Sequence, residues 1–426
     1  MEELNQLSAA VAARRIAAGQ LKSEDLVRAC LDRIKSRDAE VRAWVDFDPA
    51  PALAQARAAD SRREHGPLAG IPVGVKDVLD TADLPTQCNS PIYQGYRPLA
   101  DAACVALARR AGGLVLGKTV TTEFASRSPG ATRNPHNLEY SPGGSSSGSA
   151  AAVADFMVPL ALGTQTGGSV IRPAAYCGIV GYKPSFGTIN CAGMKHLAES
   201  LDTIGVLART VEDCALLAGA LSGRSVPDFA AKLQRAPRIG LCRTPRWHEA
   251  SSATQALLEN TAAALARRGA TLRDIALPQD FERIYDDQLL IMNYEAARAL
   301  LWEYRHHADL LSEHMRNTVK EYGAMPRAPY ADAMRNASTC RARLPQVFAD
   351  VDVLLTPSAP DEAPKGITAT GSPVFNRNWT VLHVPCVTLP AGRGPQGLPL
   401  GVQIVGNYDA DARTLECAEW VRQALE

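Results

Sequence analysis

The chain has 426 residues, of which 46% are hydrophobic and 21% charged, a composition typical of a globular protein with a large core. Its 45 basic and 45 acidic residues cancel to a formal net charge of zero, which argues against electrostatic binding to nucleic acid or to an anionic membrane. The ten cysteines include no Cys-x-x-Cys pair and the eight histidines no His-Glu-x-x-His motif, so we expect no local metal site.

The sequence also predicts a location. The first residues, Met1-Glu2-Glu3-Leu4, lack the basic and then apolar pattern of a secretory signal. The uncharged stretch 156–171 is too short and too polar to span a bilayer. Ten unpaired cysteines fit a reducing compartment. We therefore expect a cytoplasmic protein.

The first 65 residues have a helical pattern. Ser23 is a good N-cap that precedes two acidic residues, and a second, Ala-rich helix is predicted over 50–63. The segment from Leu68 to Asp77 is instead short, apolar and bounded by Gly and Pro, as a buried strand is, and Lys76 lies at its end. The apolar residues that define the first helix are Leu26, Val27, Cys30, Leu31 and Ile34.

After residue 77, helical and strand patterns alternate, which favours an α/β layer architecture. No repeat, low-complexity tract or clear linker divides the chain, so we expect one domain over 1–426. Helices are predicted at 100–111, 146–154, 252–268, 280–322, 330–348 and 410–425, and strands at 114–116, 158–162, 238–242, 351–355 and 398–405.

Two clusters of small residues lie within 141–173. In each cluster a serine follows a Gly-Gly pair, giving Ser145 and Ser169. Glycine permits unusual backbone angles and the close approach of another group, so either hydroxyl can be presented to a substrate. The pattern indicates serine chemistry with two candidate nucleophiles.

Two other interpretations of the first cluster fit poorly. Residues 144–148 match the G-x-S-x-G motif with Ser146 as nucleophile, but polar residues ending in Pro142 stand where that motif needs a strand. A phosphate-binding loop needs a lysine near its end, and residues 148–150 have none. We therefore expect the remaining serines of the cluster to cap the following helix: Ser146, Ser147 and Ser149.

The second cluster suits a nucleophile better. Residues 166–169, Thr-Gly-Gly-Ser, place consecutive backbone N–H groups beside one hydroxyl, as an oxyanion hole requires. A nucleophilic serine also needs a base, and the nearest histidine, His136, has no acid placed to orient it. Because burial lowers the pKa of a lysine, Lys76 at the end of its apolar strand can serve instead.

These segments together resemble the amidase signature family. The match is dense over 68–209 and looser in the C-terminal half, through 352–357 and 397–403. The matching pieces are GGSSSGSAAAVA (143–154), LGTQTGGSVIRPA (162–174), GIPVGVKD (70–77), LGKT (116–119), NPHN (134–137), GYKP (181–184) and SLDTIG (200–205).

The resemblance implies a fold: a single large α/β domain with a mixed, mostly central β-sheet covered by helices on both faces. Within that domain we expect a helical N-terminal arm (1–65), a catalytic signature core (66–210) and a remainder that shapes the substrate pocket (211–426).

The resemblance also implies a Ser-cisSer-Lys triad. By motif position, Ser169 is the nucleophile, Ser145 the bridging serine and Lys76 the base, and the Gly144–Ser145 peptide bond is expected to be cis. The chemistry implied is amide hydrolysis through an acyl-enzyme, with no metal or organic cofactor. The expected oxyanion hole consists of the N–H group of Ser169 and those of Thr166, Gly167 and Gly168.

Two positions bear on the substrate. Many members of the family carry Asp where this chain has Gln165; we expect that residue to be structural, so that activity persists. Residues 164–178 resemble the malonamidase branch, in which an arginine three residues after the nucleophile binds the substrate carboxylate. Arg172 occupies that position, and a guanidinium fits a carboxylate. The alternative is that Arg172 pairs with an internal acid.

The sequence thus predicts an amidohydrolase that cleaves a small linear amide, such as the carboxylate-bearing amide malonamate. We expect a small-molecule substrate, no nucleic-acid or membrane partner, and a homodimer as one assembly. One alternative is a broader amide, ester or carbamate hydrolase. Another is the glutaminase-like subunit of a tRNA-dependent amidotransferase, against which the motif around Gln165 and the compact C-terminal half count.

Overall fold

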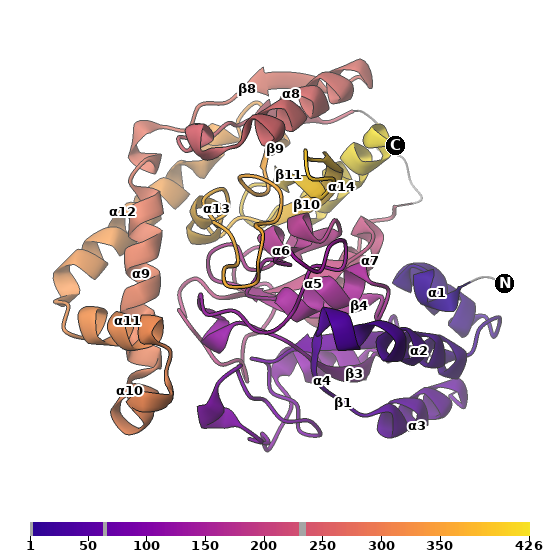
Figure 1. Cartoon of the computed structure of the whole chain (residues 1–426). Coiled ribbons are helices and arrows are strands. Elements are labelled where there is room, and N and C mark those ends of the chain that lie inside the picture. Colours follow the sequence, from indigo (N-terminus) through magenta and orange to yellow (C-terminus); the bar gives the residue numbers. More distant parts are fainter. Residues whose placement is uncertain (1–2, 63–65, 230–235) are drawn as a thin grey trace.

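A computed structural model describes residues 3–62, 66–229 and 236–426 (Figure 1). In these ranges the centre of the molecule is an 11-stranded mixed sheet with the order β1-β3-β2-β4-β6-β5-β10-β11-β9-β7-β8. The strands are β1 (Trp44–Phe47), β2 (Pro72–Lys76), β3 (Leu114–Thr119), β4 (Leu160–Gln165), β5 (Val180–Lys183), β6 (Thr203–Ala208), β7 (Arg238–Leu241), β8 (Thr271–Asp274), β9 (Val353–Pro357), β10 (Cys386–Arg393) and β11 (Pro399–Val405).

Helices cover this sheet. Two of them, α5 and α6, contact each other and the middle strands, while α4, α7, α8 and α14 form a second connected group. Helices α9 to α12 stand along one side of the sheet (Figure 1, orange). The helices are α1 (Ala9–Ala17), α2 (Ser23–Val41), α3 (Pro49–Asp60), α4 (Ala103–Arg110), α5 (Ser147–Ala154), α6 (Ile171–Tyr176), α7 (Val211–Ser222), α8 (Ser252–Arg267), α9 (Ile284–Ala299), α10 (Leu301–His307), α11 (Glu313–Gly323), α12 (Arg327–Val347), α13 (Arg377–Val381) and α14 (Asp411–Leu425).

The α/β class and the mixed sheet flanked by helices are confirmed. The main apolar core lies between the sheet and its helices, and a second cluster joins α9, α12 and α13 to β9. None of the helices in the described part of the chain combines the length and apolarity that crossing a bilayer would require.

The N-terminal region is not wholly helical. β1 interrupts it and pairs antiparallel with β3, with Trp44 opposite Thr119. Three of its four residues are Trp, Val and Phe, which favour strands, and the Trp44 side chain is buried. The Ala-rich helix predicted over 50–63 is α3, and its predicted last residue, Arg63, lies outside the described residues.

The single helix predicted over 280–322 is several shorter ones. Helix α9 ends at Ala299, α10 follows directly, and α11 starts anew after Ser312. Ser312 Oγ accepts a hydrogen bond from the N–H group of Met315 at 3.3 Å, which is the bond of an N-cap. This serine marks a helix start that the apolar pattern alone does not reveal.

Candidate functional site

The three expected catalytic side chains come from segments that meet at the centre of the sheet. Lys76 is the last residue of β2, and Ser169 follows the end of β4 at Gln165. Because β2 and β4 are parallel neighbours, their carboxyl ends lie at the same edge of the sheet. Ser145 precedes α5, which packs against both strands. The fold therefore gathers residues that are distant in the sequence.

Lys76 is fully buried. Its Nζ lies 2.7 Å from Ser145 Oγ, 2.7 Å from Thr164 Oγ1 and 3.3 Å from the Thr164 carbonyl oxygen. Burial lowers the pKa of this amine to about 7; the negative charge of Asp202 opposes the shift and the positive charge of Arg172 adds to it. A neutral amine has two N–H groups, which suffice for Thr164, and a lone pair that can accept the Ser145 proton. The environment therefore suits a lysine that acts as a base.

The backbone before Ser145 has an unusual geometry. The Gly144–Ser145 peptide bond is cis, as the family resemblance implies. Arg172 donates from Nη2 to the Gly144 carbonyl oxygen at 2.6 Å and to Thr370 Oγ1 at 3.2 Å. No described acid pairs with Arg172, in contrast to the alternative considered from the sequence. The guanidinium therefore holds the peptide that presents Ser145.

The side chain of Gln165 bridges the two ends of the loop that carries Ser169. Gln165 Oε1 accepts hydrogen bonds from the N–H groups of Val170 and Ile171 at 2.9 and 3.1 Å. Its Nε2 donates to Thr380 Oγ1 at 3.0 Å. These contacts agree with a structural role for this position. A carboxylate would accept the same two bonds but would not donate to the threonine.

The carbonyl groups of the loop are also engaged. Gln288 Nε2 donates to the Thr166 oxygen at 2.9 Å, and Thr380 Oγ1 donates to the Gly167 oxygen at 2.8 Å. Within the described residues, no acceptor pairs with the N–H groups of Gly167, Gly168 and Ser169. All three residues border the cavity described below. Free donors beside a hydroxyl are the arrangement that an oxyanion hole needs.

Ser169 itself is 8% exposed. The N–H group of Ser146 donates to the Ser169 carbonyl oxygen at 3.3 Å. This bond joins the segment of Ser145 to the loop of Ser169. The two serines that follow Gly-Gly pairs thus lie in adjoining backbone segments, and Lys76 contacts Ser145.

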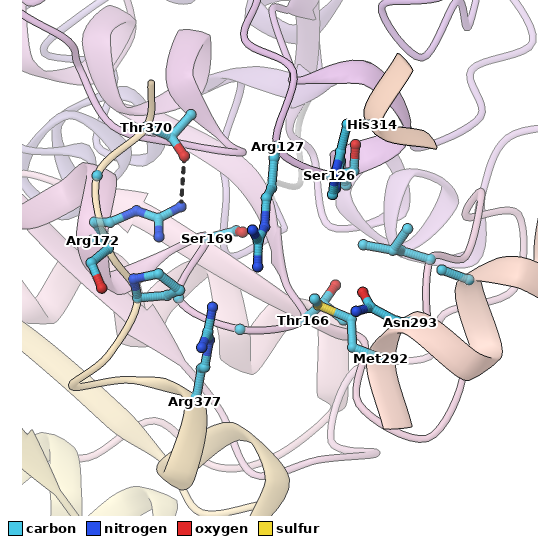
Figure 2. Close-up of a pocket in the computed structure, with 18 of the residues that line it drawn as sticks. Ser126, Arg127, Thr166, Ser169, Arg172, Met292, Asn293, His314, Thr370 and Arg377 are labelled. Atoms are coloured by element: carbon cyan, nitrogen blue, oxygen red, sulfur yellow. Dashed lines mark hydrogen bonds between the residues drawn. The ribbon is translucent and has the colours of Figure 1, made fainter. Parts of the chain in front are cut away.

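A cavity of about 430 Å³ opens beside Ser169. Loop 166–169, parts of α9 and α11 and loop 368–373 form its wall, and three arginines border it: Arg127, Arg172 and Arg377 (Figure 2). Of the described residues that line it, none is Asp or Glu. No cluster of three His, Cys, Asp or Glu side chains that could hold a metal ion occurs in the described chain. The cavity is therefore suited to a small neutral or anionic molecule.

The serines after Ser145 do not cap α5. The helix has no side-chain cap at its N-terminus. Ser146 Oγ accepts a hydrogen bond from the N–H group of Thr164 at 3.2 Å, and Ser147 and Ser149 donate to carbonyl groups of the neighbouring β3–β4 region. The expectation is wrong because α5 packs so closely on the strands that these hydroxyls reach their backbone.

The other lysines in family-like segments lie away from the cavity. Lys118 Nζ lies 3.2 Å from Asp77 Oδ1, and both side chains are fully buried. Lys183 donates to the carbonyl oxygen of Pro184 at 2.8 Å. Neither residue borders the cavity, which fits the structural roles expected from the sequence.

Several residues of the site were not predicted. Thr164 lies within the same family-like segment as Ser169, so its position in that motif was an available signal. Gln288, Arg127 and Arg377 lie in segments without a recognisable motif. Only the folded chain brings these three to the cavity or to the loop beside it.

Known proteins match this chain over nearly its whole length. A family model described as Amidase matches residues 25–415. The glutamyl-tRNA(Gln) amidotransferase A subunit of Roseiflexus castenholzii is 35% identical, over 95% of this chain and 93% of its own length. A crystal structure of an amidase has a TM-score of 0.89 and 28% identity, covering 99% of this chain and 100% of the other. A chain from a vestigial complex that reveals the origins of an s-triazine catabolic enzyme has a TM-score of 0.89 and 27% identity, covering 98% of each.

Proposed function

Since the chain belongs to the amidase signature family, whose members act on amide C–N bonds, we propose that it hydrolyses a small linear amide through an acyl-enzyme on Ser169. Ser145 relays the proton, and Lys76 is the base. The observation that carries this proposal is the 2.7 Å contact between Lys76 Nζ and Ser145 Oγ, beside a cavity that Ser169 borders.

The proposed reaction begins with proton transfer. Neutral Lys76 accepts the proton of Ser145, Ser145 accepts that of Ser169, and Ser169 Oγ attacks the amide carbonyl carbon. The N–H groups of residues 166–169 stabilise the resulting oxyanion. The relay returns the proton to the leaving amine as the C–N bond breaks. Water then hydrolyses the acyl-enzyme by the same path and restores Ser169.

The finer proposal concerns the substrate's charge. A carboxylate-bearing amide such as malonamate is the finer candidate, and by analogy with the malonamidase branch Arg172 is one candidate ligand for its carboxylate. What supports this role is that Arg172 borders the cavity and that its Nε has no described partner. Its Nη2, in contrast, is engaged with Gly144 and Thr370. A broader amide, ester or carbamate hydrolase remains the alternative if Arg172 serves only to hold Gly144.

A second candidate function is that of the A subunit in a glutamyl-tRNA(Gln) amidotransferase. The curated relatives favour it over malonamidase, since those of Roseiflexus castenholzii and Chloroflexus aggregans bear that name at 35% and 34% identity. The chain would then work within a complex. The cavity argues against an amino-acid substrate such as glutamine, because none of its described lining residues is an acid that could pair with the ammonium group.

Mass spectrometry of the acyl adduct tests the proposal. The purified chain would be mixed with malonamate, malonamide, glutamine, an anilide and a carbamate. We expect an adduct on the peptide that contains Ser169, and none in the Ser169→Ala variant. An adduct on another residue would refute the nucleophile, and one that forms only after the other components of an amidotransferase are added would support the second candidate. The expected homodimer and cytoplasmic location stay predictions.

A further inference from the structure

Three arginines approach the cavity from separate parts of the chain. Arg127 follows the short helix η3 (Glu123–Ala125), Arg172 lies in α6 and Arg377 is the first residue of α13. Arg172 is buried, Arg377 is half-buried and Arg127 is exposed. Figure 2 shows their side chains converging on the space in front of Ser169. Only Arg172 lies in a segment that resembles a known motif.

These arginines lack the counter-ions that other arginines of the chain have. Among the described residues, no hydrogen bond or ion pair engages the guanidinium group of Arg127 or that of Arg377. In contrast, Arg243 contacts both Glu259 and Asp274, and other surface arginines are paired in the same way. Some exposed arginines elsewhere, such as Arg110 and Arg268, have no described partner for their guanidinium groups either. Arg377 differs from them because its unpaired guanidinium is half-buried at a cavity whose described lining contains no Asp or Glu.

The charges of the three arginines also act on one another. Burial lowers the pKa of Arg172 to about 10, and the positive charges of Arg377 and Arg127 add to that shift. Burial likewise lowers the pKa of Arg377 to about 10; the positive charge of Arg127 adds to this shift, and the negative charges of Glu249 and Asp286 oppose it. Both pKa values lie well above 7, so Arg172 and Arg377 keep their positive charges at neutral pH. Like charges held together in a cavity repel one another, and a bound anion would remove that repulsion.

We propose that Arg127 and Arg377 form an anion-binding subsite and that the substrate is an amide with a carboxylate but no ammonium group. A carboxylate placed between the two guanidinium groups would accept charge-assisted hydrogen bonds from both. An ammonium group would face these positive charges with no Asp or Glu among the described lining residues to pair with it. The proposal rests on Ser169 being the nucleophile, because the subsite is defined by its position beside that residue.

Activity on two nearly isosteric amides provides the first test. Malonamate and malonamide differ in that one carries a carboxylate where the other carries a carboxamide. We expect the ratio of kcat/KM for malonamate to that for malonamide to fall at least about tenfold in Arg127→Gln and in Arg377→Gln, chiefly through KM. The lysine variants, Arg127→Lys and Arg377→Lys, should recover part of the ratio. Arg335→Gln, on the exposed face of α12, is the matched control and should leave it unchanged.

Binding without turnover provides the second test. Malonate would be titrated into the Ser169→Ala variant by calorimetry. We expect binding that weakens as salt is added and that falls at least about tenfold when Arg127 and Arg377 are both replaced by Gln. Thermal melting would verify that each variant is folded, and a folded double variant that binds malonate as tightly as its parent overturns the subsite.

The outcomes separate this inference from the proposed function. If Ser169→Ala still hydrolyses malonamate, the nucleophile is wrong whatever malonate does. If Ser169 forms an adduct but the wild type prefers malonamide or glutamine to malonamate, the nucleophile stands and the anion subsite is wrong. Preference for malonamate with unchanged selectivity in both arginine variants would also refute the subsite and would leave Arg172 as the carboxylate ligand.

Discussion

At the scale of single residues, Lys76 is an amine whose surroundings keep it poised between charged and neutral. Burial favours the neutral form, and the nearby charges of Asp202 and Arg172 act in opposite directions. With its pKa at about 7, the amine is substantially neutral at physiological pH. A base tuned in this way works best near neutrality because it is both available and strong enough to accept a proton.

The rate should therefore depend on pH through Lys76. We expect kcat/KM for malonamide to fall about tenfold per pH unit below a pH of about 7, as the amine takes up a proton. In Arg172→Gln a positive charge is lost, so the pKa of Lys76 should rise and the acid limb should move to higher pH. Profiles of both proteins measured side by side provide the check. A flat profile would exclude Lys76 as the base.

The two glycines before Ser169 should respond differently to substitution. A Cβ on Gly168 would lie 2.4 Å from Asn376 Oδ1, whereas one on Gly167 would meet nothing closer than 3.8 Å. Asn376 is fully buried and donates to the Ser358 carbonyl oxygen at 3.0 Å, so it cannot easily withdraw. We expect Gly168→Ala to lower kcat by about 100-fold or more by displacing the loop donors, and Gly167→Ala to lower it less. Equal losses would contradict this explanation.

The catalytic candidates could be predicted from the sequence because each lies in a short contiguous motif. Ser145 and Ser169 are marked by Gly-Gly pairs, and Lys76 ends an apolar segment. Arg127 and Arg377 could not be predicted, since they reach the cavity from loop and helix termini that have no characteristic pattern. Gln288 was missed for the same reason: its contact with Thr166 depends on how α9 packs and not on its neighbours in the chain.

At the scale of elements, α5 is the helix whose packing fixes Ser145. Its Gly148 lies directly against the backbone: a Cβ there would be 2.2 Å from the Ala43 oxygen and 2.4 Å from the Val120 nitrogen. No side chain, however small, fits between α5 and the backbone just before β1 and just after β3 at that separation. This glycine therefore sets how closely α5, and with it Ser145, approaches β3.

Gly148→Ala should consequently destabilise the fold. We expect a loss of about 3 kcal/mol or more, because rigid backbone cannot move aside for the new methyl group. Gly323→Ala is the matched control: it lies at the end of α11 with nothing within 4 Å of the added Cβ, and it should stabilise by about 0.5 kcal/mol. Urea unfolding of the three proteins measures the difference. A Gly148→Ala protein as stable as the wild type would contradict the packing argument.

Glycine also explains why some elements were missed. The strands β5 and β6 were not predicted, and each contains a glycine that weakens the apolar pattern. A Cβ on Gly181 would lie 2.6 Å from Ala174 Cβ, and one on Gly205 2.8 Å from the Tyr182 oxygen. Gly181 permits close packing of α6 on the sheet and Gly205 the close approach of β5, whereas in the sequence alone such glycines indicate turns. Long amphipathic helices such as α8, α12 and α14 have no such ambiguity and were predicted to within a few residues.

At the scale of the whole molecule, one sheet joins the two halves of the chain. β5, from the first half, pairs with β10 from the second, with Val387 opposite Tyr182. The division proposed between a catalytic core over 66–210 and a remainder over 211–426 thus falls within a continuous hydrogen-bonded layer. The proposed catalytic residues come from the first part, while Arg377 and residues of α9 and α11 border the cavity from the second.

A chain cut after residue 210 should therefore fail to fold by itself. Its β5 would become an exposed, apolar edge whose backbone groups lack partners. We expect residues 1–210 to show no cooperative thermal transition, in contrast to the full chain, and to regain one when residues 211–426 are expressed alongside. A sharp transition in the isolated fragment would show that the core is an independent domain.

The short helix α13 has a double attachment that constrains how this enzyme can evolve. Arg377 faces the cavity, while Thr380, one turn later, donates to the Gly167 carbonyl oxygen. A substitution of Arg377 that changes substrate selectivity therefore lies in the same five-residue helix that binds the loop carrying Ser169. Many side chains at position 377 could change which substrate binds, but only those that leave α13 in place will preserve turnover. Diversification of this enzyme should consequently favour exchanges at Arg127, which lies outside α13.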